Sequence, residues 1–147
     1  DHVSHKGKTL LHVLAKQATY KWVKLLLDNG ADPNLIDDNK NTALHHAAKN
    51  KDPNVIKLLL QHSADPNMQN YVGNTPLHIA VKNQNNEHIT VLLENKANPN
   101  ILNSAESTPL YYAIERNLYY TAEILLNYGA NPNTENKCLR LDRDFLE

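Results

Sequence analysis

Apolar residues return along this chain at a fixed interval of 33 residues. A Leu-Leu pair, a Leu two residues after a Thr, and a Pro followed by Asn each occur four times at that spacing. The threonines are Thr9, Thr42, Thr75 and Thr108, and the leucine pairs begin at Leu26, Leu59, Leu92 and Leu125. A period of this length without insertions predicts stacked units, each of which buries its apolar stripe against its neighbours.

Within each unit, the pattern predicts two short helices and a turn. The run from Thr75 to Val81 has a threonine that can cap a helix and a proline at the first helical position, where no backbone N–H is needed. In the second helix, apolar residues three and four apart form one stripe, as at Val55, Leu58 and Leu59. We expect breaks between the helices near residues 18–20, 51–54, 84–86 and 117–119, and exposed hairpin-like loops at 35–41, 68–74 and 101–107.

The composition narrows the function classes. A chain of 147 residues with a net charge of -1 has no excess of basic residues with which to attract nucleic acid or an anionic membrane. The single cysteine, Cys138, excludes an internal disulfide, and no apolar run is long enough to span a bilayer. Without disulfides or a membrane span, the fold must be stabilised by burial of the regularly spaced apolar residues.

Three motifs carry a resemblance to a known family. Thr-Pro-Leu-His-Ile-Ala at 75–80, Leu-Leu-Leu at 25–27 and Gly-Ala-Asp-Pro-Asn at 30–34 look like the ankyrin repeat. The resemblance covers residues 5–136 as four repeats, at 5–37, 38–70, 71–103 and 104–136. It implies an all-α solenoid of stacked helix-turn-helix units. Residues 1–4 are expected to be a flank, and 137–147 an irregular cap or tail that ends in a cloning remnant, Leu146-Glu147.

Some residues depart from the family pattern. Residues other than glycine stand at turn positions where the family usually has glycine, and a left-handed backbone there costs about 1 kcal/mol. These residues are Ala18, Lys51, Ser63, Gln84, Lys96 and Asn117. Leu10, Val13 and Leu14 stand on the first helix, and their exposure would favour further repeats upstream, because terminal repeats need a polar outer side.

The histidines and the cysteine do not form a recognisable reaction centre. His12, His45 and His78 are one repeat apart, and packed helices lie about 8–10 Å apart, which is too far for one zinc ion. The resemblance implies that these histidines hydrogen-bond near the threonine at the helix start. With four glycines there is no phosphate loop and no nucleophile motif. We therefore expect no enzyme activity, no metal and no cofactor.

The resemblance implies that a partner docks on the loop tips and on the inner helices of a concave face. By position, the tips are at residues 5–6, 38–39, 71–72 and 104–105, and the inner-helix positions are 16–17, 49–50, 82–83 and 115–116. A lysine row (Lys16, Lys49 and Lys82) predicts an acidic segment as ligand, although lysines also occur for solubility alone. The candidate partner-binding residues are Lys16, Lys49, Lys82, Asp38, Asn39, Tyr71, Val72, Tyr112, Glu115 and Arg116.

The asparagines after the repeated prolines have two interpretations. In animal cells, ankyrin asparagines at this turn position can be substrates of an asparagine hydroxylase. The alternative is that asparagine tolerates turn geometry and bonds its own backbone. The candidate positions are Asn34, Asn67, Asn100 and Asn133.

Two functions remain open from the sequence. The first is a monomeric, cytoplasmic, non-catalytic module that binds another protein through the concave face and the loop tips. The alternative is the substrate-recruiting part of a larger enzyme, or a secreted effector of an intracellular bacterium or virus that acts in the host cytosol. An excess of Asn and Lys, which is typical of A/T-rich genomes, suggests the effector.

Overall fold

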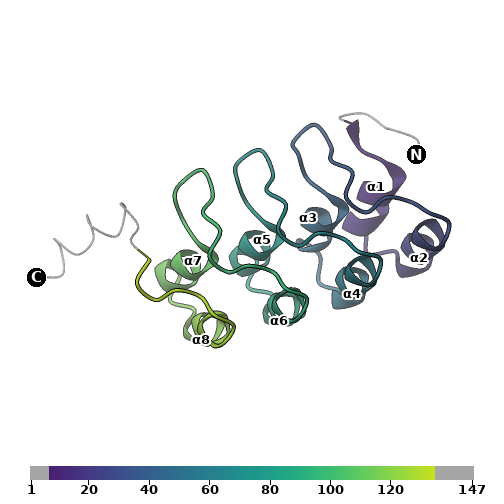
Figure 1. Ribbon diagram of the computed structural model, residues 1–147. Helices are drawn as coiled ribbons and strands as arrows, with labels where there is room; N and C mark the ends of the chain where they lie inside the picture. Colours follow the sequence, from purple (N-terminus) through teal and green to yellow (C-terminus); the bar gives the residue numbers. More distant parts are fainter. Residues whose placement is uncertain (1–6, 135–147) are drawn as a thin grey trace, which may run out of the picture.

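The computed structural model describes residues 7–134, in which helices come in pairs, one pair for each 33-residue unit. The pairs are α1 (Leu10–Lys16) with α2 (Tyr20–Asp28), α3 (Ala43–Ala47) with α4 (Pro53–Gln61), α5 (Pro76–Lys82) with α6 (Asn86–Glu94), and α7 (Pro109–Glu115) with α8 (Tyr119–Asn127). Figure 1 shows α1, α3, α5 and α7 in an inner row, α2, α4, α6 and α8 in an outer row, and long loops projecting beyond the inner row. The all-α solenoid is confirmed. The expected flank and C-terminal cap lie outside the described residues.

The inner helices begin where the sequence predicts. Thr75 has an extended backbone, and its side chain accepts a hydrogen bond from the backbone N–H of His78. Pro76 then occupies the first turn, where it removes no helical hydrogen bond. A seven-residue helix is too short to be stable alone, so packing against neighbouring units holds it.

The core is one continuous apolar layer between the two rows of helices. Leu44 and Leu77 from the inner row and Leu59, Leu92 and Leu125 from the outer row are fully buried. Because these residues recur at the same positions, each repeat contributes the same kind of side chains to the core. Truncation of any one of these leucines to alanine would lower the free energy of unfolding by about 2–5 kcal/mol.

Five of the six residues expected in left-handed turns have a positive φ angle, and Lys51 does not. The prediction for Lys51 is wrong because α3 ends early, at Ala47, and the chain takes another path into α4. There the Asn50 side chain accepts the N–H of Asp52 at 3.0 Å, and Pro53 holds Asp52 in an extended conformation. The five confirmed residues are Ala18, Ser63, Gln84, Lys96 and Asn117.

The outward side of the first repeat is apolar. Leu10 is exposed, while Val13 and Leu14 are half-buried. Trp22 is 60% exposed, although the residues at its position in the next three repeats (Val55, His88 and Thr121) are buried. This end surface therefore has the character of an interface between two repeats.

Candidate functional site

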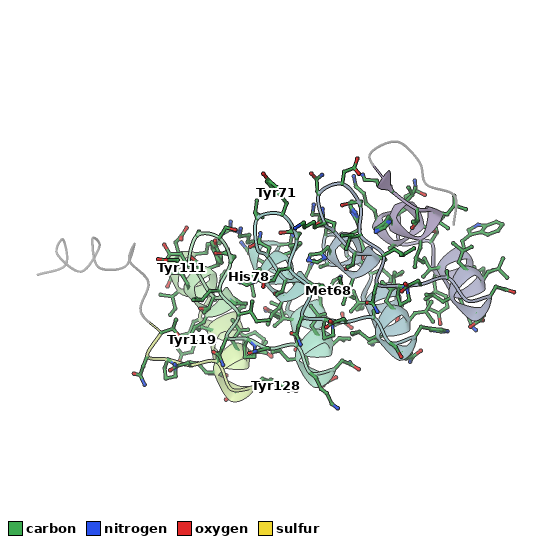
Figure 2. All side chains as sticks on the ribbon, turned by 45° about the horizontal axis from the view of Figure 1, so that its top comes forward. Met68, Tyr71, His78, Tyr111, Tyr119 and Tyr128 are labelled. Carbon is green, nitrogen blue, oxygen red and sulfur yellow. The ribbon has the colours of Figure 1, made fainter. Side chains whose placement is uncertain are left out.

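The loop tips form a connected row. The backbone N–H of Tyr71 donates to the carbonyl of Asn39 at 2.9 Å, and the N–H of Ser104 donates to the carbonyl of Val72 at 3.0 Å. Tyr71 is 75% exposed, and Figure 2 shows it at the end of its loop, pointing away from the helices. It does not pack onto its own loop. Of the expected tips, residues 5–6 lie outside the described part of the chain.

Side-chain amides at the base of the loops hold this row in place. The Asn70 carboxamide oxygen accepts the N–H groups of Val72 and Asn74 at 3.1 and 3.0 Å, which closes its own loop. The Asn103 amide then donates to the Asn74 side-chain oxygen at 2.9 Å, which joins one loop to the next. Because the loops are ordered before any ligand arrives, a ligand that binds them loses less entropy in ordering them.

Two of the three lysines in the lysine row have exposed side chains, and the third contacts a tyrosine ring. Lys16 and Lys49 are exposed, as expected. Lys82 is half-buried, and its Nζ lies 4.4 Å from the centre of the Tyr112 ring, a cation–π contact. The Tyr112 hydroxyl accepts a hydrogen bond from the Asn103 amide at 2.8 Å. Lys82 and Tyr112 therefore join an inner helix to a loop base, so Lys82 is less exposed than Lys16 and Lys49.

Other expected inner-helix residues also make contacts between repeats. Asn50 is not fully exposed, because its amide donates to the carbonyl of Ala15 in the preceding repeat at 2.8 Å. Arg116 donates from Nη1 to the carbonyl of Lys82. Glu115 is exposed. We call the surface formed by the tips at 38–39, 71–72 and 104–105 together with residues 16–17, 49–50, 82–83 and 115–116 the finger face.

Sequence reasoning missed two apolar residues on the loops. Ile36 and Leu102 are exposed and occupy the same position of the first and third loops. Gln69, which occupies that position in the second loop, donates to the carbonyl of Leu102 at 2.9 Å. An apolar residue recurring within a polar, turn-rich loop is the signal that could have found them.

The repeated histidines connect each helix start to the next loop. His45 Nδ1 accepts the backbone N–H of Thr42 at 3.0 Å, so its other nitrogen, Nε2, carries the proton and donates to the carbonyl of Asn74 at 2.9 Å. His78 makes the same contacts with Thr75 and with the carbonyl of Ser107. His78 is fully buried, and Figure 2 labels it near the middle of the array. The structural role of these histidines is confirmed.

Burial lowers the pKa of His45 and of His78 to about 4, against the opposing effect of the hydrogen bond to the carbonyl.

His46 and Asp37 form a buried pair. His46 Nε2 donates to the Asp37 carboxylate at 2.9 Å, and the ring of His46 meets that of His12 edge to face. Burial lowers the pKa of His46, while Asp37 opposes this shift. Burial alone would raise the pKa of Asp37, but hydrogen bonds from His46 and from the backbone of Asn41 and Asn39 lower it. Asp37 is therefore a charged anchor for the first loop.

His88 is a buried histidine whose ring nitrogens have no hydrogen-bond partner within the described residues. It lies on α6 near the backbone of Asn50 in the second repeat, which is too poorly aligned to count as a hydrogen-bond partner. Burial lowers the pKa of His88, and the Asn50 backbone opposes this shift. Thr121 occupies the same position in the fourth repeat, and its hydroxyl donates to the Asn86 side chain. At this position of the repeat, Thr121 therefore has a hydrogen-bond partner for its buried polar group, whereas His88 has none within residues 7–134.

Replacing His88 with valine, the residue at the same position in the second repeat, is expected to stabilise the protein by about 1 kcal/mol. A buried polar group without a partner carries a desolvation cost of about 1–3 kcal/mol, which valine avoids with little change in volume. The matched control, Thr121→Val, removes a satisfied hydroxyl and should destabilise by about 1 kcal/mol. Urea unfolding measures both, and a loss of stability in His88→Val would refute this view of the site.

The asparagines at the repeated turn bond across repeats. The Asn67 amide donates to the carbonyl of Lys96 at 3.2 Å, and its side-chain oxygen accepts the N–H of Asn98 at 2.7 Å. Asn34 and Asn100 make the equivalent contacts. These bonds give the asparagines a structural role beyond turn formation. Hydroxylation at Asn34, Asn67, Asn100 and Asn133 stays a prediction.

Metal sites and membrane spans can both be assessed over residues 7–134. This part of the chain contains no group of three or more His, Cys, Asp or Glu side chains arranged to hold a metal ion. No helix in it is long and apolar enough to cross a membrane.

A family model for ankyrin repeats, built from three copies, matches residues 1–70 and again residues 62–136. The chain belongs to the ankyrin repeat family. No curated protein matches it significantly. Ankyrin repeats are generally protein–protein interaction modules, so the finger face of this ankyrin array is the surface to consider for a protein partner.

Proposed function

We propose that this ankyrin array is a non-catalytic binding module whose finger face takes an acidic segment of another protein. The observation that carries the proposal is the fixed row of loop tips, together with two exposed lysines at the same position of successive repeats, Lys16 and Lys49. The exposed Tyr71 and Val72 add an aromatic and an apolar contact at the centre of the row. Aromatic and cationic groups are enriched at the energetic centres of protein interfaces.

The repeat spacing gives the ligand a pattern. Inner helices of neighbouring repeats lie about 8–10 Å apart. Lys16 ends α1 and Lys49 lies two residues beyond the end of α3, so we expect a similar distance between the two lysines. A segment in the polyproline II conformation rises about 3.1 Å per residue with three residues per turn, so acidic side chains three residues apart lie on one side, about 9 Å apart, and match the two lysines. The module therefore favours segments with two acidic residues separated by two others, followed by an apolar residue for Tyr71 and Val72.

Reversing the charge of both lysines, in the Lys16→Glu, Lys49→Glu variant, is expected to weaken binding at least tenfold. Repulsion replaces attraction at two contacts, and the salt dependence of the affinity should fall with it. The probe is a peptide selected from a random phage-displayed library on the full chain, and fluorescence anisotropy at several salt concentrations gives its affinity.

The matched control is Lys21→Glu, Lys57→Glu, which makes the same charge change on exposed positions of α2 and α4 in the same two repeats. It should change the affinity by less than twofold. Selected peptides without acidic residues, or equal losses in the two double variants, would contradict the proposal.

A further inference from the structure

The four outer helices carry a row of exposed side chains on the side away from the loop tips. Figure 1 shows α2, α4, α6 and α8 in this outer row. On α2, the exposed residues Lys21, Lys24 and Asp28 are three and four residues apart, so they lie on one side of the helix. The residues at the same three positions of α4, α6 and α8 are also exposed, apart from the half-buried Thr90. We call the residues at these three positions of the four outer helices the back ridge.

Charge is divided unevenly along the back ridge. In the first two repeats the ridge carries three lysines and one aspartate, a net charge of +2, and in the last two repeats it carries three glutamates and no basic residue, a net charge of -3. The ridge is therefore complementary in charge to a second copy of itself that runs in the opposite direction. The lysines are Lys21, Lys24 and Lys57, and the glutamates are Glu87, Glu94 and Glu123.

Two arrangements bring two back ridges face to face about a two-fold axis. With the axis along the helices, the first repeat of one copy lies opposite the fourth repeat of the other, and equal positions of the helices meet. Lys24 then faces Glu123 on both sides of the axis. Lys21 faces Tyr120, which is 63% exposed, so that its ring can contact the ammonium group as the Tyr112 ring contacts Lys82. No pair of equal positions in this arrangement joins two like charges.

The second arrangement has the axis along the stack, so that each repeat lies opposite its own copy and the helices run antiparallel. Lys24 then faces Lys24, Lys57 faces Lys57 and Glu123 faces Glu123. Glu87 also faces Glu94 on both sides of the axis. Because like charges placed opposite each other oppose association, the charge pattern favours the first arrangement.

The area of the back ridge fits a weak contact. Each outer helix has nine residues, which corresponds to a length of about 13 Å. Four such helices at a spacing of about 8–10 Å form a face of roughly 500 Å². Stable interfaces bury about 800 Å² on each partner. We therefore expect a dissociation constant in the micromolar range or weaker, and one that rises with salt concentration.

We propose that two copies of this chain associate through their back ridges, with the first repeat of each copy opposite the fourth repeat of the other. The finger faces lie on the other side of each array and stay free. The dimer goes beyond the proposed function, because it presents two finger faces to a partner that carries two acidic segments. The monomer expected from the sequence is then the state at low concentration.

An exchange of charges tests this arrangement. Sedimentation equilibrium of the full chain at low salt, over a series of concentrations, should show an equilibrium between monomer and dimer. Lys24→Glu and Glu123→Lys should each weaken the dimer roughly tenfold, because each change places like charges opposite each other at two sites. The variant that carries both changes again has opposite charges at these sites, so its dissociation constant should return to within about threefold of the original.

The matched control is Glu115→Lys, the same charge change at an exposed position of α7 in the same repeat. It should change the dissociation constant of the dimer by less than about twofold. A monomer at every concentration would overturn the proposal, as would a double variant that dimerises as weakly as the single variants. Masses beyond two copies would show end-to-end stacking, which does not close, and would also overturn it. A peptide with one acidic segment binds each finger face separately, so its affinity tests the proposed function independently of the dimer.

Discussion

Acidification from pH 6.5 to pH 4 is expected to remove about 3 kcal/mol of stability for each of His45 and His78. Each ring is neutral in the folded protein because Nδ1 accepts a threonine N–H and the site is buried. The pKa falls from an ordinary 6.5 to about 4 in the folded state. Between these values the unfolded chain binds the proton and the folded chain does not, so stability is fully present above pH 6.5 and is lost as the pH falls.

Two such losses approach the whole stability of a typical domain, about 5–15 kcal/mol, so we expect the array to unfold between pH 6.5 and 4. Urea unfolding at a series of pH values measures the effect. His78→Gln should be less stable at pH 7, because the hydrogen bonds of the ring to the Thr75 N–H and the Ser107 carbonyl are lost, but its stability should fall less steeply with acid. A variant that keeps the full pH dependence would show that His78 is not the titrating group.

Gly73→Ala is expected to lower the free energy of unfolding by about 3 kcal/mol or more and to separate the loop at 68–74 from the loop at 101–107. Gly73 has a φ angle of +78°, which an alanine adopts only with strain of about 1 kcal/mol. A Cβ atom there would also lie 2.6 Å from the backbone nitrogen of Ser104 and 2.9 Å from the Cα of Asn103. Neither is the end of a flexible side chain, so the neighbouring loop must move, and the bond from Ser104 to Val72 is lost.

Gly30→Ala is the matched control, because it introduces the backbone strain of a positive φ angle without a steric clash with a neighbouring loop. Gly30 has a φ angle of +92°, but a Cβ atom there would meet nothing within 4 Å. This variant should therefore lose only about 1 kcal/mol. Thermal unfolding of the two variants measures the difference, and equal losses would show that the contact between loops does not stabilise the array. Because Gly73 lies in the finger face loops, Gly73→Ala should also weaken peptide binding, whereas Gly30→Ala should not.

The periodic features of this protein were predictable from sequence, and the exceptions depend on individual contacts. The Thr-Pro start of α5 and the leucine pairs place the helices because capping and apolar spacing act locally. Lys51 could not be placed in this way, since an Asn50 side chain and Pro53 together decide the path of the backbone.

The candidate site was predictable in position but not in detail. Repeat spacing put Lys16, Lys49 and Lys82 in one row, yet only Lys82 has a tyrosine within reach, because Tyr112 is supplied by the next repeat. The exposed Ile36 and Leu102 were not predicted because they recur only in alternate loops, with Gln69 at the same position between them. Which of these side chains are free depends on contacts across repeats.

Hydrogen exchange of the full chain with and without the selected acidic peptide locates the bound ligand. If the peptide binds the finger face, exchange should slow in the loop tips at 38–39, 71–72 and 104–105 and in the last turns of the inner helices, with little change in α2, α4, α6 and α8. Protection of the outer helices with unchanged loop tips would contradict binding at the finger face.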